Sequence, residues 1–247
     1  MIVSERLWCE GLNREIPVHV RLPKDYDATN ERYPVMYMFD GHNLFNDAMA
    51  TYGRSWRLDQ FLGAYDKNFI IVGLECDHRG NNRLSEYCPY DVAKSPLGPI
   101  KANGPVLMDW IIDELKPKID RELRTWPQRE ATGIAGSSMG GLMAWYALLH
   151  HNDVFSKAAA LSPSLPLCAK DALKEMAEAN PDADTRLYIS MGGREGKGMG
   201  NRRMLREFST PLARKGMQVK VNFVPQGQHN EASWEKESPV WFDYLWK

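Results

Sequence analysis

A serine inside a glycine-rich pentapeptide carries the sharpest chemical signal in this sequence. The stretch Gly-Ser-Ser-Met-Gly at residues 136–140 fits the pattern Gly-x-Ser-x-Gly, with Ser138 at its centre. A chain of this size contains such a pattern by chance roughly one time in ten, so the context matters. A short apolar run precedes the pentapeptide and a helix-like segment follows it, which is the arrangement that a nucleophile elbow needs. We therefore interpret Ser138 as a nucleophile.

Two other interpretations of the same turn are a glycine-rich connection without catalytic meaning and a phosphate-binding loop. The sequence contains neither the lysine of a Walker motif nor the glycine spacing of a dinucleotide-binding motif. Kinase and dehydrogenase functions are therefore disfavoured.

A serine hydroxyl needs a base, and the base needs an acid to orient it. In an elbow-type hydrolase these residues follow in the order serine, acid, histidine. His229 is the only histidine beyond the elbow helix and its end, and Glu195 is the only carboxylate in the loop 192–196. We predict that His229 is the base and Glu195 the acid. The alternatives are an exposed loop histidine and a solvated carboxylate paired with Arg194 or Lys197.

Backbone N–H groups must stabilise the negative oxygen that forms during acyl transfer. Met139 follows the nucleophile directly and is expected to supply one N–H group. We expect the second from His42, in the loop after the apolar run 35–39. The alternative is that Asp40 and Gly41 form an ordinary turn, and their spacing does not match a calcium loop.

Alternating apolar runs and helical patterns predict the elements that position these residues. Residues 16–22 alternate between apolar and polar types, which predicts an antiparallel edge strand near the N-terminus. Continuously apolar runs, typical of strands covered on both faces, lie at 35–39, 69–74, 132–135, 158–161, 187–191 and 219–224. Helical patterns lie at 58–65, 106–123, 141–149, 171–179 and 204–215. This alternation predicts an α/β fold with a doubly wound, mostly parallel sheet flanked by helices.

Composition limits the classes of partner. The 247 residues include 31 basic and 32 acidic side chains, a net charge of −1, which argues against nucleic acid or an anionic membrane as the main partner. No apolar run approaches the roughly 20 residues of a membrane span, and the first residues lack a signal-peptide pattern. The four cysteines have no zinc-binding spacing and are expected to be free thiols. We expect a single cytoplasmic domain over residues 1–247, without a metal or cofactor; the oligomeric state stays open.

A long irregular stretch at residues 76–105 is predicted to wall the substrate pocket, because loops of this length in compact domains are often functional. The candidate pocket residues are Asn43, Trp56, Arg83, Glu86 and Tyr87, with the segment 165–167 beside them. Surface packing is an equally acceptable interpretation of this stretch.

Several stretches together resemble a known family. They lie at residues 37–45, 114–120, 136–141, 161–164, 191–196 and 227–231. In this order the sequence resembles the putative esterase family of the α/β-hydrolase superfamily, which includes enterochelin-type siderophore esterases, feruloyl and acetyl-xylan esterases of the first carbohydrate esterase family, and mycolyltransferases.

The resemblance implies an α/β-hydrolase fold, a triad of Ser138, Glu195 and His229, and N–H donors at Met139 and His42. Two departures matter. Many family members have glutamine where His42 stands, and some siderophore esterases of the family work with only serine and histidine.

The sequence therefore predicts a serine carboxylic-ester hydrolase that forms an acyl-enzyme on small acyl, carbohydrate or hydroxycinnamoyl esters. An acyltransferase on the same scaffold would use the same residues. A non-catalytic binding protein would have a damaged triad, which this sequence does not show.

Overall fold

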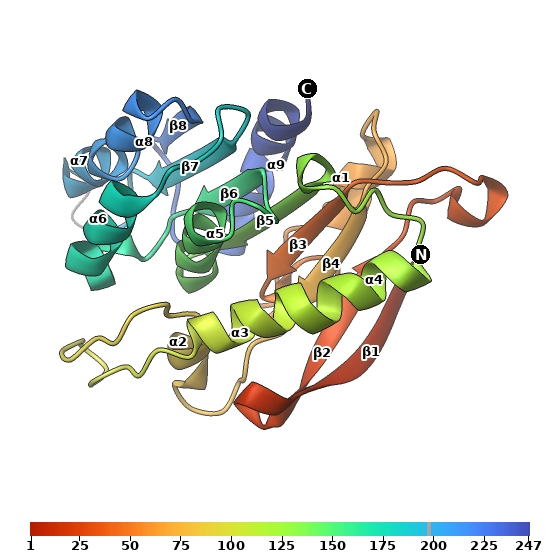
Figure 1. Ribbon diagram of the computed structural model, residues 1–247, viewed down its shortest axis with the longest axis horizontal. Helices are drawn as coiled ribbons and strands as arrows, with labels where there is room; N and C mark the ends of the chain where they lie inside the picture. Colours follow the sequence, from red (N-terminus) through yellow and green to blue (C-terminus); the bar gives the residue numbers. More distant parts are fainter. Residues whose placement is uncertain (197–198) are drawn as a thin grey trace.

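The described residues form one mixed sheet of eight strands in the computed structural model, which describes residues 1–196 and 199–247 (Figure 1). The strands are β1 (Ile2–Cys9), β2 (Arg14–Arg21), β3 (Val35–Phe39), β4 (Ile70–Leu74), β5 (Thr132–Ser137), β6 (Lys157–Leu161), β7 (Arg186–Gly192) and β8 (Gln218–Val224). Their order in the sheet is β1-β2-β4-β3-β5-β6-β7-β8. Strands β3 to β8 pair in parallel, whereas β2 is antiparallel to both β1 and β4. The predicted α/β-hydrolase fold with antiparallel N-terminal strands is confirmed.

Both edges of the sheet differ from the sequence-based expectation. The run 16–22 belongs to β2, which is not an edge strand because it lies between β1 and β4. The edge is β1, a strand that the sequence analysis does not predict. The run 219–224 was expected to be covered on both faces, but it belongs to β8, the opposite edge, where Val221 is 44% exposed. Position within a sheet depends on which strands become neighbours, and residue alternation alone does not encode this.

The helices follow the strands in an α/β pattern. Their bounds are α1 (Leu58–Ala64), α2 (Asn82–Glu86), α3 (Gly104–Trp110), α4 (Lys116–Glu122), α5 (Met139–His150), α6 (Ala169–Glu178), α7 (Met199–Glu207), α8 (Thr210–Arg214) and α9 (Glu231–Trp246). Short helical turns are η1 (Glu10–Leu12), η2 (Tyr26–Ala28), η3 (Gly41–Asn43), the π turn η4 (Ile111–Leu115), η5 (Arg129–Ala131) and η6 (Leu165–Cys168). None of the helices in the described part of the chain is long and apolar enough to pass through a bilayer.

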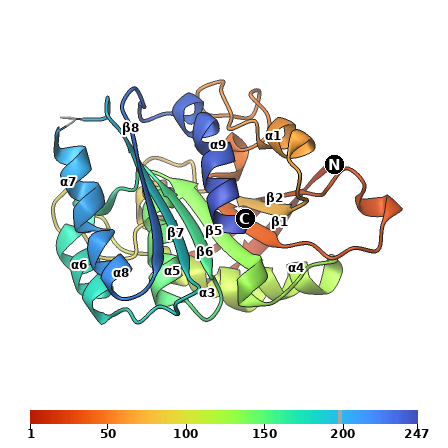
Figure 2. The same cartoon turned by 90° about the horizontal axis from the view of Figure 1, so that it is seen from above.

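The helices divide between the two faces of the sheet (Figure 2). Helices α1 and α9 cover one face, where Leu58 and Leu62 pack in the same apolar cluster as Trp241 and Phe242. The other helices from α3 to α8 contribute to the cluster on the opposite face, in which Trp145 is fully buried. Burial on both sides explains the continuously apolar central strands.

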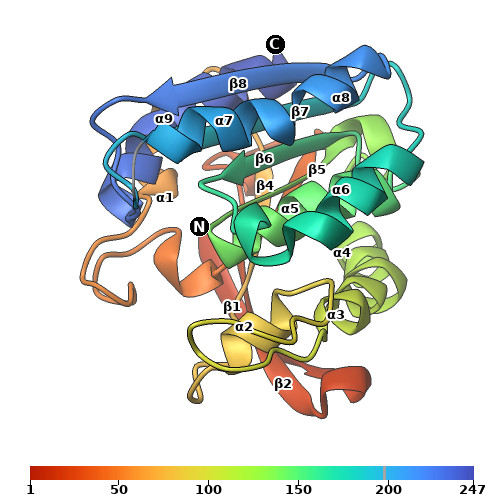
Figure 3. The same ribbon diagram turned by 90° about the vertical axis from the view of Figure 1, so that its left-hand side faces the viewer.

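Two of the predicted helices are divided by proline. The segment 204–215 forms α7 and α8, which lie along β7 and β8 (Figure 3). Pro211 lacks an N–H group, and its ring would clash with the carbonyl of Glu207, at which α7 ends. The segment 106–123 forms α3, the π turn η4 and α4, and this wider turn includes Asp113, the residue four before Pro117. Helix α9 at the C-terminal end is an element that the sequence analysis does not predict.

Candidate active site

Ser138 lies at the sharp turn between β5 and α5. Its backbone has φ 58° and ψ −119°, a strained conformation for a residue with a side chain. The turn is tight because its glycines lie against other parts of the chain: a Cβ at Gly136 would lie 2.6 Å from the carbonyl carbon of Gly140. A Cβ at Gly140 would lie 2.8 Å from that of Phe39. The glycines on either side of Ser138 are therefore required by close packing, and the turn has the geometry of a nucleophile elbow.

A chain of hydrogen bonds joins the three side chains predicted as the triad. The Oγ of Ser138 lies 2.8 Å from Nε2 of His229, and Nδ1 of His229 lies 2.7 Å from Oε2 of Glu195. His229 follows β8 and Glu195 follows β7, whereas Ser138 follows β5. The carboxyl ends of parallel strands lie at one edge of the sheet, so residues 91 positions apart in the sequence meet there.

The carboxylate of Glu195 is held from its other side. Its Oε1 accepts hydrogen bonds from the hydroxyl of Ser162, at 2.6 Å, and from the N–H of Gly192, at 2.7 Å. The indole N–H of Trp234 donates to the Oγ of Ser162 at 2.9 Å, and the Trp234 ring meets the imidazole of His229 edge to face. The sequence analysis does not identify Ser162 or Trp234 as supports of the triad.

In the described part of the chain, Glu195 pairs with His229 and not with Arg194, one of the two alternative partners considered from the sequence. Within residues 1–196 and 199–247, the ion pair of Glu195 is with His229, and none joins it to Arg194. Lys197 lies outside the described residues. Glu195 is buried, whereas the side chain of His229 is 46% exposed. The carboxylate is thus shielded from water while the imidazole can be reached by it.

The two residues expected to donate N–H groups lie at helix starts. Met139 is the first residue of α5, and His42 lies in the short helix η3 that follows β3. N–H groups in a first turn have no acceptor within their own helix, so they remain available to a ligand. The imidazole of His42 points elsewhere: its Nε2 lies 2.9 Å from Oγ1 of Thr51. Burial lowers the pKa of this imidazole.

Two cavities meet at Ser138. The larger has a volume of about 690 Å³, and its apolar wall includes Leu84, Pro96, Leu97, Ile100, Leu167 and Met191. The smaller has a volume of about 280 Å³ and is lined mostly by polar side chains, among them Asp40, Asn43 and Glu231. Ser138, His229 and Arg83 line both cavities. Ser138 therefore has an apolar cavity on one side and a polar cavity on the other.

Two of the five predicted pocket residues lie at these cavities. Arg83 forms two hydrogen bonds with the carboxylate of Asp40, at 2.7 and 2.6 Å. Asn43 lines the smaller cavity, where its amide donates to Oε1 of Glu231 at 3.2 Å. Burial raises the pKa of Glu231. Arg83 and Asn43 thus stand where a substrate could contact them.

The other three predicted pocket residues are not among the described residues that line either cavity, which corrects the prediction. Trp56 is buried against Trp234. Glu86 forms an ion pair with Arg14, at 2.6 Å, beneath the loop. Tyr87 is fully buried, and its hydroxyl accepts from the N–H of residue 40 and donates to the carbonyl of residue 74. All three have structural partners that the sequence pattern does not reveal.

The stretch 76–105 is less irregular than predicted. It contains helix α2, and a bridge pairs Val92 with Ile100. The tip between these two residues supplies Lys94 to Leu97 to the wall of the larger cavity, and Pro166 and Leu167 of η6 face them from the same cavity. One part of the stretch therefore walls a cavity, and the part around Glu86 supports it.

Comparisons with known proteins give matches in sequence and in fold. A family model described as "putative esterase" matches residues 9–241. The protein YbbA of Bacillus subtilis is 22% identical over 178 residues, which cover 71% of this chain and 67% of that protein.

Solved structures share the fold. An IroE-like serine hydrolase from Shewanella oneidensis superposes with a TM-score of 0.74 at 23% identity, over 99% of this chain and 79% of that chain. The enterobactin esterase FES from Shigella flexneri, in the presence of 2,3-di-hydroxy-N-benzoyl-serine, superposes with a TM-score of 0.76 at 18% identity, over 100% of this chain and 59% of that chain.

Proposed function

The chain belongs to the putative esterase family and is a carboxylic-ester hydrolase, and on that premise we propose that it works through a triad of Ser138, His229 and Glu195. The observation that carries this proposal is the continuous hydrogen-bonded chain from the Ser138 hydroxyl through the His229 ring to the Glu195 carboxylate, with distances of 2.8 and 2.7 Å. This geometry supports Ser138 as nucleophile, His229 as base and Glu195 as orienting acid in acyl transfer.

In the first half of the proposed reaction, the Oγ of Ser138 attacks the carbonyl carbon of the ester while Nε2 of His229 takes the hydroxyl proton. The carbonyl oxygen becomes negative, and the N–H groups of Met139 and His42 stabilise it. The C–O bond to the alcohol then breaks, and His229 gives its proton to the departing oxygen. An acyl group remains bonded to Ser138.

Water completes the reaction. His229 removes a proton from a water molecule as that water attacks the acyl carbon, and then returns the proton to Ser138 while the carboxylic acid leaves. Glu195 orients the imidazole and stabilises its charged form in both halves. The half-exposed His229 ring is consistent with access by water. These steps use side chains and backbone N–H groups of the chain, together with water.

The two cavities support a division of the substrate. We assign the acyl group to the larger apolar cavity, whose volume admits a hydroxycinnamoyl or other aromatic group as well as a short chain. The alcohol portion lies in the smaller polar cavity beside Asn43 and Arg83. Small acyl esters and carbohydrate or hydroxycinnamoyl esters fit this division. FES, which has the same fold, is an enterobactin esterase whose structure was solved in the presence of a benzoyl compound.

The test is a panel of model esters with acyl groups from acetyl to feruloyl, read as kcat/KM, for the native protein and Ser138→Ala. We expect kcat to fall by about 10³-fold or more in the variant, because triad members act as a unit, with an unchanged circular dichroism spectrum. Full activity in Ser138→Ala would refute the assignment of the nucleophile.

Acyl transfer to an alcohol is the second candidate function, because the smaller polar cavity beside Ser138 could hold an acceptor in place of water. Product analysis in the presence of a sugar or glycerol separates the two. A new ester that replaces most of the free acid would favour a transferase, and free acid as the main product would favour a hydrolase. No turnover of any ester by the folded protein would favour a binding function.

A further inference from the structure

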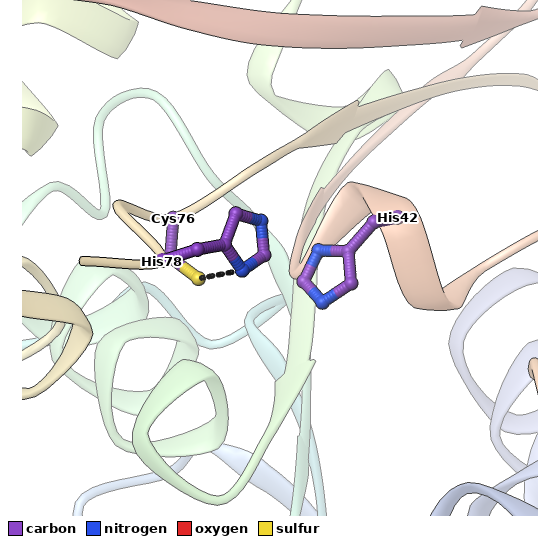
Figure 4. A group of neighbouring side chains, drawn as sticks. All are labelled: His42, Cys76 and His78. Carbon is purple, nitrogen blue, oxygen red and sulfur yellow. Dashed lines mark hydrogen bonds between the residues drawn. The ribbon is translucent and has the colours of Figure 1, made fainter. Parts of the chain in front are cut away.

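A second group of reactive side chains lies outside the triad, in the wall of the smaller cavity. His42 follows β3, and Cys76 and His78 follow β4, the parallel neighbour of β3 (Figure 4). One potential ligand atom from each of these residues lies within 4.8 Å of the other two, and the Sγ of Cys76 is 3.9 Å from Nδ1 of His78. All three residues line the cavity that reaches Ser138.

In both imidazoles, Nε2 lies within hydrogen-bonding distance of a neighbouring oxygen. The Nε2 of His78 lies 3.0 Å from Oε2 of Glu75, and the Nε2 of His42 lies 2.9 Å from Oγ1 of Thr51. A carboxylate can only accept a hydrogen bond, so Nε2 of His78 carries the proton and Nδ1 presents its lone pair to Cys76. A histidine whose other ring nitrogen donates to a carboxylate or another oxygen is the usual arrangement of a metal ligand.

The other ring nitrogen of His42, Nδ1, has no partner among the described residues, which indicates a ligand that the protein itself does not supply. Only 7% of His42 is exposed, and its Nδ1 is a buried atom with no hydrogen-bond partner among the described residues. Figure 4 shows the rings of His42 and His78 side by side, and they meet edge to face with their centroids 4.5 Å apart. A buried polar atom without a partner is costly, and a metal ion bound at Nδ1 of His42 would satisfy it.

We propose that His42, Cys76 and His78 bind a divalent transition-metal ion of the Zn²⁺ type, with its fourth position open to the smaller cavity. Two imidazoles and one thiolate are ligands that Zn²⁺ prefers. In a tetrahedral site their ligand atoms would lie roughly 3.3–3.6 Å apart, so atoms that lie as much as 4.8 Å apart must approach one another. The side chain of His78 is 52% exposed and can reorient toward the ion.

The surrounding charge favours a cation. The Glu75 carboxylate accepts from His78 and also contacts His19, at 2.6 Å. The cation in the same cavity wall is Arg83, and its charge is balanced by the two hydrogen bonds to Asp40. An ion held here would fill space that we assign to the alcohol portion of the ester, and it would fix the residue whose N–H group we assign to the oxyanion. We therefore expect Zn²⁺ to inhibit turnover reversibly, and this consequence, unlike the binding itself, rests on the proposed function.

Binding is tested on the resting protein by titration with Co²⁺, which gives a near-ultraviolet charge-transfer absorption when bound to thiolate, and by calorimetry with Zn²⁺. We expect one ion per chain and a thiolate band in the native protein. His78→Gln should weaken binding by about 10-fold or more, and Cys76→Ser should abolish the band. His150→Gln is the matched control, since its side chain is 51% exposed and pairs with Glu175 far from the cluster.

Absence of the thiolate band, or equal affinity in the native protein and His78→Gln, overturns the metal site. His78 is exposed, so this variant remains informative if Cys76→Ser does not fold. If the protein binds the ion as expected but has no esterase activity, the metal site is supported and the proposed function is rejected. Ion binding without any inhibition would reject only its position in the path of the alcohol.

Discussion

At the scale of single residues, the two oxygens of the Glu195 carboxylate have different partners. One oxygen receives the imidazole of His229, and the other is held by Ser162 and by the N–H of Gly192. A carboxylate fixed through both oxygens cannot rotate away from the imidazole, and its burial keeps water from competing for it. The serine that supports it is itself constrained, with φ 45° at Ser162 and a hydrogen bond from Trp234.

Ser162→Ala tests this support. Removal of the hydroxyl takes one of the two donors from Oε1 of Glu195, which keeps the N–H of Gly192, and leaves the indole N–H of Trp234 without its partner. A buried unsatisfied group costs about 1–3 kcal/mol. We expect kcat to fall by roughly 10-fold, KM to change little and the melting temperature to drop. Steady-state kinetics and thermal unfolding measure these effects. Ser238→Ala is the control: this serine is also buried, but its hydroxyl has no hydrogen-bond partner among the described residues and it lines neither cavity. If kcat is unaltered in Ser162→Ala, then Ser162 is not needed to position Glu195 for turnover.

At the scale of secondary structure, the turn between β5 and α5 depends on backbone contacts that leave no room for side chains. Gly136 has the carbonyl group of Gly140 where its Cβ would be, and backbone cannot move aside as a flexible side chain can. The elbow is thus determined by the close packing of its own strand and helix.

Gly136→Ala should therefore destabilise the protein by more than about 2 kcal/mol and abolish esterase activity in any fraction that folds. Gly63→Ala in α1 is the control, since nothing lies within 4 Å of its added Cβ. A helical glycine replaced by alanine without a clash gains about 0.5–1 kcal/mol. Chemical unfolding of both variants gives the comparison, and equal stability would contradict the packing argument.

Helix α9 carries a buried carboxylate that makes stability depend on pH. Glu237 accepts from the hydroxyl of Tyr188, at 2.6 Å, and from the amide of Asn222, at 3.2 Å. Burial nevertheless raises its pKa. A carboxyl whose pKa is raised by folding binds more protons in the folded state, so its contribution to stability falls as pH increases from the ordinary carboxyl value through the raised one.

Glu237→Gln keeps an oxygen for both donors and removes the charge. We expect the variant to gain stability relative to the native protein at about pH 8, and the gain to shrink at about pH 5 as the native carboxyl becomes protonated. Differences in melting temperature at the two pH values measure this. A gain that grows toward acid pH would show that burial does not raise the pKa of this carboxyl.

At the scale of the whole molecule, the larger cavity is built from segments that are distant in sequence. The tip of the stretch after β4, the turn η6 after β6 and the loop after β7 each contribute to its wall. Its size is therefore set by how these segments pack on the sheet, and each of them can be changed separately.

Leu167→Trp should narrow this cavity. We expect kcat/KM for bulky aromatic acyl esters to fall by about 10-fold or more, and that for acetyl esters to change by less than about 2-fold, because pocket size discriminates by a few kcal/mol at most. Leu123→Trp is the control, since Leu123 is also partly buried against the core but does not line the cavity. An equal loss for large and small esters would place the acyl group elsewhere.

The meeting of Ser138, His229 and Glu195 was predictable because each follows an apolar strand, and the carboxyl ends of parallel strands meet at one edge of the sheet. The mostly parallel sheet was predictable because burial on both faces leaves continuous apolar runs. These signals are local, and the sequence by itself determined them.

Only the tertiary structure decided which strands form the edges, which residues of the stretch 76–105 face a cavity, and that Ser162 supports Glu195. It also brought His42 to Cys76 and His78, whose ligand spacing is invisible in the sequence because 34 to 36 residues separate them. Contacts of this kind depend on how distant segments of the chain pack together. Residue type and periodicity do not indicate which distant segments will become neighbours.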